Sequence, residues 1–474
     1  MITTGGSYSP RRKNIILASC CLSLLIGSMD ATIVNVAIPA VRADLGASAA
    51  QVQWVIDIYT VVLASLLLLA GAAGDRFGRR RVFQIGLTVF ALGSLLCSLA
   101  PDIHLLIAAR FIQAIGGSML NPVALSIVSQ IFVGRVERAR ALGWWGAVVG
   151  ISMALGPIVG GLLIAFVGWR SVFWINLPIC VVAIVLTAVY VPESRSSTMR
   201  DIDPVGQLLA LLTLFGVVFV LIEGPALGWT DPRILSLGAV AAMAFPAFLR
   251  FESRRHDPFI DLRFFRSIPF SSATMIAVCS FAGWGAFLLM MSLYLQGERG
   301  YSAAHTGLFY LPLAIGALIF SPLSGRLVGR FGSRPSLLAA GGLITVAAVL
   351  LTFLTANTDV WQLLTIFSLY GIGFGMVNAP ITNAAVGGMP QDRAGAASAV
   401  TATSRQVGVC IGIALCGLLA GGALTAGGAD FTSAARPLWF VNVGLGLTIV
   451  ALAFVSTSTR ARQSAQRLAP LIAS

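Results

Sequence analysis

The chain of 474 residues is 57% hydrophobic and only 10% charged, with a mean hydropathy of +0.90. A soluble domain has about 25% charged residues, so this composition excludes a soluble protein and indicates an integral membrane protein. The net charge of +13 does not indicate nucleic-acid binding, because the basic residues lie in short loops between apolar segments and form no basic domain.

Long apolar runs, such as Ile15–Met29 and Val61–Ala73, predict membrane-spanning helices, because the strands of a membrane β-barrel would alternate polar and apolar residues. Charged and turn-forming residues separate fourteen such segments, joined by short loops. The predicted spans are residues 14–39, 51–74, 82–100, 103–132, 138–165, 170–190, 204–224, 233–250, 267–296, 303–328, 335–355, 359–388, 394–422 and 436–457. We therefore expect an all-α integral membrane fold.

Three charged residues lie within the first four predicted helices, where a charge is costly and is by default a sign of function. Asp30 stands in the first helix, Asp57 in the second and Arg110 in the fourth. The helical rise of about 1.5 Å per residue puts them at similar depths, so an Asp–Arg cluster can form. A carboxylate exposed alternately to the two sides could carry protons, and these three residues are the predicted proton-coupling set. The alternative for both acids is a structural ion pair.

The turn after the second predicted helix occurs twice in the chain. GAAGDRFGRR at Gly71–Arg80 recurs in outline as GRLVGRFGSR at Gly325–Arg334. Glycines allow two helix ends to approach, Asp75 can hold an arginine or a helix N-terminus, and arginines can bind anionic headgroups. The predicted conformational latch consists of Gly71, Asp75, Arg76, Gly78, Arg79, Arg80, Arg330 and Arg334. A topological anchor is the alternative, and Gly329 in place of Asp75 would make a latch asymmetric.

A repeated turn in a membrane protein is typical of a secondary transporter built from two similar halves. Eight predicted helices lie between the two copies, whereas two six-helix halves alone would leave six. We therefore predict an N-terminal six-helix half at residues 1–190, two inserted helices with their linkers at 191–266, and a C-terminal six-helix half with a short tail at 267–474.

The fifth predicted helix contains the sequence SMALGPIVGG at Ser152–Gly161. Pro157 removes one backbone donor, and Gly156, Gly160 and Gly161 permit bending and close helix contact. This pattern predicts a bendable seam between the two halves. An ordinary packing face is the alternative.

Five further residues are candidates for a substrate cavity. Trp284 and Tyr294 belong to a series of aromatic and methionine residues in the ninth helix, which could form a polarizable wall or simply face lipid. Glu223 ends the seventh helix, and the alternative to a cavity role for this residue is a structural or peripheral one. Arg405 and Gln406 lie within the thirteenth helix, where an arginine needs a counter-charge, an anionic substrate or water.

The sequence does not indicate catalysis. The only lysine is Lys13, so a P-loop cannot occur. The seven cysteines lack metal-ligand spacing, and the three histidines lie in loops or at helix ends. We therefore predict a protein that is not an enzyme, uses no cofactor or metal, and draws on an ion gradient.

The distribution of the 31 Lys and Arg residues predicts the orientation. With the N-terminus inside, the outer loops hold only Arg42, Arg170, Arg233, Arg299 and Arg436. This positive-inside bias puts both termini in the cytoplasm. A monomer is expected, because two halves can form a pathway within one chain, and the expected partners are small molecules, protons and membrane lipids.

Several segments resemble motifs of the fourteen-helix drug–proton antiporters of the major facilitator superfamily, and most closely the methylenomycin-resistance type. They are Asp30–Pro39, Gly71–Arg81, Arg110–Gly116, Ser152–Gly161, Trp169–Ile179, Tyr294–Gln296 and Gly300–Leu308. Ala114 and Ser152 replace glycines of the family patterns. The likeness covers nearly the whole chain.

The resemblance implies the major facilitator fold, a bacterial plasma (inner) membrane, and proton-driven antiport that exports small amphipathic drugs or antibiotics. Asp30 would match a carboxylate that recognises a proton or cation, and Arg110 an arginine that mediates proton transfer. The substrate does not follow from these motifs. A dedicated exporter of one endogenous metabolite, peptide or lipid is the second hypothesis, and a non-transporting membrane sensor or scaffold is the third.

Overall fold

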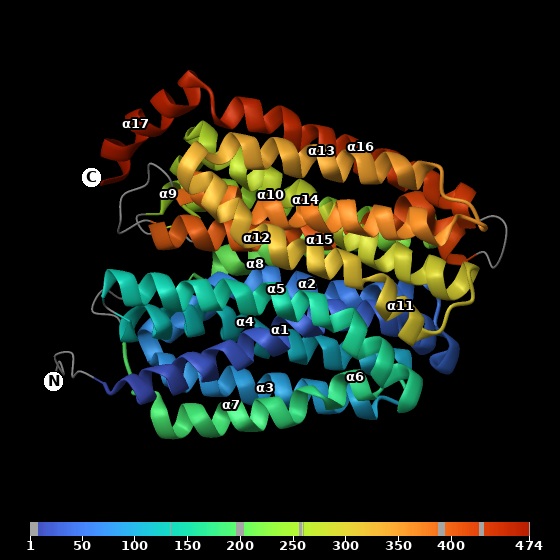
Figure 1. Cartoon of the computed structure of the whole chain (residues 1–474), viewed down its shortest axis with the longest axis horizontal. Helices are drawn as coiled ribbons and strands as arrows, with labels where there is room; N and C mark the ends of the chain where they lie inside the picture. Colours follow the sequence, from blue (N-terminus) through green and yellow to red (C-terminus); the bar gives the residue numbers. More distant parts are fainter. Residues whose placement is uncertain are drawn as a thin grey trace.

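The computed structural model describes residues 8–132, 134–195, 203–255, 258, 260–386, 394–425 and 431–473 (Figure 1). This part of the chain is helical and contains no strand. Thirteen of its helices are long and apolar enough to cross a membrane. The remaining predicted span is α5 (Arg135–Phe166), a helix of 32 residues whose segment Leu155–Phe166 is apolar. The predicted all-α membrane fold is confirmed.

The helices follow one another along the chain with short connections. The first group is α1 (Pro10–Leu45), α2 (Ala49–Phe77), α3 (Arg79–Leu99), α4 (Ile103–Ile131), α5, α6 (Ser171–Trp174) and α7 (Asn176–Tyr190). The next pair is α8 (Pro204–Leu227) and α9 (Pro232–Arg254). The last group is the 3₁₀ turn η1 (Leu262–Arg266), α10 (Ile268–Leu293), the π turn η2 (Tyr294–Glu298), α11 (Ala303–Phe309), α12 (Leu311–Phe331), α13 (Ser333–Thr352), α14 (Val360–Val386), α15 (Ala394–Thr425), α16 (Phe431–Ser456) and α17 (Thr459–Ala473).

The structure differs from the predicted spans in two respects. The predicted spans 170–190 and 303–328 are each broken into two helices, and in the second case Pro312 at the start of α12 cannot donate a backbone hydrogen bond. The short tail forms α17, which packs on η1 and α10 and buries Ala461, Ala465 and Leu468 on one face.

The two copies of the repeated turn share a backbone requirement. Gly78 has φ of 114° and Gly332 has φ of 79°, a region that side chains with a Cβ rarely enter. Each glycine ends one helix and starts the next within a single residue, at α2–α3 and α12–α13. The matching glycines therefore produce the same sharp turn in both halves of the chain.

The helix pairing is repeated as well. α2 packs on α4 and α3 on α7, while α12 packs on α14 and α13 on α16. α1 to α7 occupy the lower part of Figure 1, and α10 and α12 to α17 the upper part, while α11 lies at the right beside the lower group. α8 contacts both α2 and α15. The start of α1 and the end of α17 lie at the left of the view, which we call the terminus-side end, and α6 and α11 lie at the right, the opposite end.

The two groups meet tightly near the opposite end. Gln53 in the first turns of α2 donates to the carbonyl oxygen of Ile413 in α15 at 2.8 Å. Gln296 in η2 donates to the carbonyl oxygen of Val36 in α1 at 3.0 Å. α5 also packs on α11. The opposite end is therefore closed by contacts between the two groups of helices.

Candidate functional site

Asp30 and Arg110 form a buried ion pair between α1 and α4. Arg110 Nη1 donates to Asp30 Oδ2 at 2.6 Å, and the two side chains are 1% and 0% exposed. Asp30 Oδ1 accepts hydrogen bonds from Gln113 Nε2 at 3.0 Å and from Asn176 Nδ2 at 3.1 Å. Ser94 Oγ accepts from the same two amides. The carboxylate is thus held by three donors, one of them charged.

The guanidinium of Arg110 is also well satisfied. Nη1 donates to Gln113 Oε1 at 2.7 Å, and Nε donates to the carbonyl oxygen of Val55 at 3.1 Å. The guanidinium carbon lies 4.1 Å from the ring centroid of Tyr59, a cation–π distance. Because both charges are paired and hydrogen-bonded, the ion pair can persist in a buried position.

Asp57 lies apart from this pair, on the side of α2 that packs against α15. Its side chain is completely buried. Oδ1 accepts a long hydrogen bond of 3.4 Å from Thr60 Oγ1, while Oδ2 has no hydrogen-bond partner within the described part of the chain. Cys410 and Cys416 of α15 are its electrostatic neighbours. Asp57 is therefore a poorly solvated carboxyl group in the contact between the two groups of helices.

Glu223 occupies the contact between α8 and α2. Its Oε1 accepts a hydrogen bond of 2.8 Å from Trp54 Nε1, and the indole ring packs against Phe215 and Phe219 of α8. This partner assigns Glu223 to the packing of the inserted pair, away from the other predicted cavity residues.

The first copy of the repeated turn is held by contacts within its own half. Asp75 Oδ1 accepts from Arg79 Nη2 at 2.8 Å. Glu193, after α7, accepts from the backbone N–H groups of Arg80 at 3.1 Å and Arg81 at 3.3 Å. A carboxylate at these N–H groups caps α3 and suits its positive helix end. Gly71 lies against α4, and Arg76 is exposed over Phe77.

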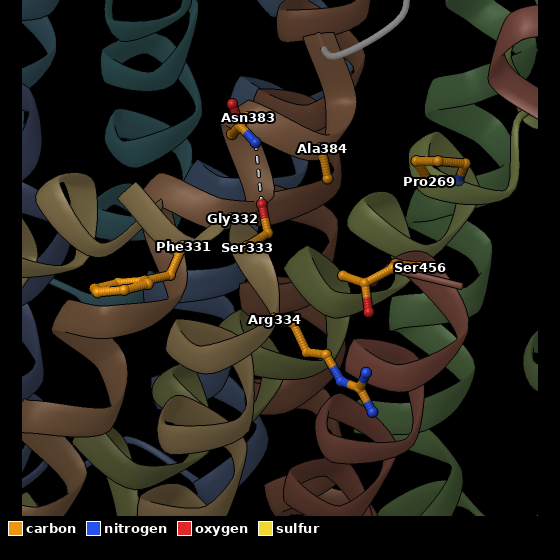
Figure 2. Close-up of a pocket in the computed structure, with 9 residues that line it drawn as sticks. Pro269, Phe331, Gly332, Ser333, Arg334, Asn383, Ala384 and Ser456 are labelled. Atoms are coloured by element: carbon orange, nitrogen blue, oxygen red, sulfur yellow. Dashed lines mark hydrogen bonds between the residues drawn. The ribbon is translucent and has the colours of Figure 1, made fainter. Parts of the chain in front are cut away.

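The second copy lines a pocket of about 320 Å³ where the start of α13 meets the end of α16 (Figure 2). Asn383 Nδ2 donates to Ser333 Oγ at 3.0 Å across this pocket. Arg334 is exposed and lies 4.6 Å from the ring centroid of Phe454, while Arg330 lies over Phe331. The contacts that the structure gives these two arginines also stay within their half.

The glycines of the fifth-helix motif lie at the closest contacts of α5. A Cβ on Gly156 or Gly160 would collide with Thr32 or Ile33 of α1. A Cβ on Gly161 would collide with the backbone of Ala303 in α11, and Gly307 lies against the carbonyl oxygen of Pro157. The motif therefore joins α5 both to its own half and, at the opposite end, to the other half.

The predicted cavity residues of the second half separate into two places. Trp284 is buried and stacks on Phe374 at 3.9 Å between ring centroids. Arg405 is half-buried near this cluster, with Gln406 beside it in the chain. Tyr294 lies ten residues beyond Trp284, roughly 15 Å along the helix, where its hydroxyl donates to the carbonyl oxygen of Thr355 at 2.6 Å. Tyr294 is thus tied to the opposite end of the bundle.

Sequence reasoning did not select several polar partners. Gln113 and Asn176 contribute two of the three donors to Asp30, and Glu193 caps α3. The two amides could have been selected from the sequence, because amide side chains within apolar segments need hydrogen-bond partners. The sequence alone does not say which distant residue supplies the partner.

Comparison with known proteins identifies one family along most of the chain. Residues 20–413 match the model of the Major Facilitator Superfamily. This match spans α1 to most of α15 and so includes both copies of the repeated turn.

Similar proteins come from several bacteria. The chain is 36% identical over 409 residues to the multidrug resistance protein Stp of Mycobacterium tuberculosis, covering 86% of this chain and 76% of that protein. It is 35% identical over 407 residues to the tetracenomycin C resistance and export protein of Streptomyces glaucescens, covering 85% and 75%. It is 32% identical over 436 residues to the methylenomycin A resistance protein of Bacillus subtilis, covering 90% and 93%.

Proposed function

Because the chain belongs to the major facilitator superfamily, we propose that it is a secondary transporter that exports small amphipathic drugs or antibiotics in exchange for protons. The relatives named for drug resistance or export support the substrate class. The observation that carries the proton-driven part is Asp57, a buried acid without a cation partner among the ion pairs of the described residues. An acidic group in this position can exchange a proton as its surroundings open and close.

We place the terminus-side end in the cytoplasm of a bacterial plasma membrane, because the basic loops lie there. The opposite end, where Gln53 bonds to α15 and α5 packs on α11, then faces the outside. In this orientation the structure corresponds to a state closed to the outside.

Within the predicted proton-coupling set, Asp57 carries the proton and the Asp30–Arg110 pair is the fixed charge that orders the N-terminal half. Asp30 already accepts from three donors, one of them the charged guanidinium of Arg110, so its carboxyl group is held in place. Asp57 has one long hydrogen bond, and a charged carboxylate in such a place costs several kcal/mol. Protonation of Asp57 therefore favours the closed seam between α2 and α15.

A transport cycle follows from this linkage. A proton from outside neutralises Asp57, the outer seam closes, and the central face opens to the cytoplasm, where a substrate binds. Loss of the proton to the cytoplasm restores the charge and opens the seam outward. In this cycle the halves at residues 1–190 and 267–474 move as units. The inserted helices at 191–266 remain packed on α2 and α15. The repeated turns stabilise the outward-open state. The monomer is the functional unit.

The test uses inverted membrane vesicles with an acidic lumen, in which export appears as dye accumulation. Wild type accumulates the dye, and Asp57→Asn loses gradient-driven accumulation while it still exchanges dye down its own gradient. Asp231→Asn is the matched control, because Asp231 caps the start of α9 and pairs there with the exposed Arg233. Accumulation by Asp57→Asn at the wild-type rate would assign the proton elsewhere. A folded wild type that moves none of a panel of drugs would favour the dedicated exporter of one metabolite.

A further inference from the structure

Arg405 is placed inside the second half, on the face of α15 that contacts α10 and α14. It stands eleven residues after the start of α15, roughly 16 Å along the helix. Its Nη2 donates to Thr382 Oγ1 of α14 at 3.0 Å, and its guanidinium carbon lies 5.8 Å from the ring centroid of Phe281 in α10. Thr382 is exposed, four residues before the end of α14, while Arg405 is half-buried.

Arg405 has no ion-pair partner among the described residues. Its Nε is buried without a hydrogen-bond partner in that part of the chain. A guanidinium has five N–H donors. In the described part of the chain, the donors of Arg405 have one acceptor, the neutral hydroxyl of Thr382. Arg110, which is also deep within a predicted span, has a carboxylate and two further oxygen acceptors. Arg405 is therefore short of acceptors by comparison within the same molecule.

A buried aromatic cluster adjoins this guanidinium. Phe281 packs edge-on against Phe374 at 5.1 Å between ring centroids, and Trp284 stacks on the same ring. Phe281 is at the edge of this cluster, 9% exposed, on the side where Arg405 lies. A cation with free donors beside aromatic side chains recognises a flat apolar body that carries an anionic oxygen.

We propose that Arg405 binds the anionic group of the transported compound, so that the preferred substrates are amphipathic anions such as carboxylates, phenolates or enolates on an aromatic body. The proposal rests on the export function above and specifies its substrate class. It also has an energetic consequence. When one monovalent anion leaves and one proton enters, the net result is that two positive charges move inward. Each of these charges contributes about 2.3 kcal/mol per 100 mV of membrane potential. A cation exchanged for one proton would gain nothing from the potential.

Two dyes with the same xanthene core and opposite charge test the proposal: fluorescein as the anion and rhodamine 6G as the cation. Binding to the purified full-length protein is measured by fluorescence polarization, without any gradient. Wild type prefers fluorescein. Arg405→Gln weakens fluorescein binding about tenfold to a hundredfold, as expected for loss of a charge-assisted hydrogen bond, and leaves rhodamine 6G binding unchanged. Arg405→Lys, which keeps the charge, recovers part of the loss.

Several results would overturn the proposal. They are equal weakening of both dyes, fluorescein binding unchanged in Arg405→Gln, a wild-type preference for the cation, and no fluorescein binding by wild type. Thermal melting of each variant shows whether it is folded. If Arg405→Gln does not fold, fluorescein binding is compared between wild type and Arg405→Lys instead. Asp57→Asn separates this proposal from the export mechanism, because it retains fluorescein binding even though it loses gradient-driven transport.

Discussion

The three charged residues of the first four helices differ in how the protein satisfies them. Asp30 and Arg110 share a closed network with Gln113 and Asn176, whereas Asp57 depends on Thr60 alone within the described residues. A buried charge that loses its partner is strongly destabilising, while an acid without a partner has little to lose. The same kind of residue therefore has opposite surroundings at two positions in one half.

This contrast gives a stability prediction. Asp30→Asn leaves Arg110 buried without its counter-charge and costs about 3–5 kcal/mol, seen as a clearly lower melting temperature of the detergent-solubilised protein. Asp57→Asn keeps the melting temperature or raises it, because it removes no ion pair. Equal losses in the two variants would show that Asp57 is charged and paired in the folded protein.

A second residue-scale prediction concerns Gly161, where α5 meets α11. Gly161→Ala places a methyl group against the backbone of Ala303, which belongs to the other half and cannot rotate away. The variant should therefore open the opposite end. Spin labels at the exposed positions Ala43 and Gly297 report this as a longer distance by double electron–electron resonance. Gly168→Ala is a control in a nearby turn where no atom lies close, although its positive φ disfavours alanine. An unchanged label distance in Gly161→Ala would show that the contact between Gly161 and Ala303 does not hold the opposite end closed.

At the scale of elements, the two repeated turns share their backbone but differ in what holds the next helix. α3 is capped by Glu193 from the end of α7, while the start of α13 adjoins the pocket at the end of α16. The duplication therefore preserved the sharp glycine turn and the helix pairing, but not the acidic contacts. Among the described residues, Asp75 and Glu193 give the first turn acidic contacts that the second turn lacks.

The Glu193 cap can be tested by itself. Glu193→Ala removes the acceptor of two backbone N–H groups, which costs about 0.5–2 kcal/mol for a helix cap. Amide hydrogen exchange in the first turn of α3 should become faster, while exchange at the start of α13 serves as the internal control. Unchanged exchange at Arg80 and Arg81 would mean that the cap contributes no stability.

Several elements could be predicted from the sequence and others could not. The spans followed from hydropathy, and the proximity of Asp30 and Arg110 followed from the cost of an isolated charge in a membrane. α17 was missed because its sequence is too polar for a span, although its buried residues have a helical period. Tyr294 illustrates a different limit. A series of aromatic residues does not show which of them faces a cavity, and the Tyr294 hydroxyl instead bonds to Thr355.

At the scale of the whole molecule, the account rests on a seam between two halves that is closed at one end. Gln53 and Gln296 make polar contacts across it, and Asp57 lies beside α15 in the same region. Such a seam can be opened by introducing a single charge, because the interface offers that charge no compensating partner. Proton binding and closure are then two aspects of one equilibrium.

The most direct test measures closure of the seam against pH. Labels at Ala43 and Gly297 in the full-length protein report the width of the opposite end by double electron–electron resonance. In wild type, lowering the pH should increase the short-distance population, because protonated Asp57 permits closure. Asp57→Asn should keep a mainly closed distance distribution that does not change with pH, since asparagine is neutral throughout. A wild-type distance independent of pH, or an Asp57→Asn variant that still switches with pH, would contradict the account.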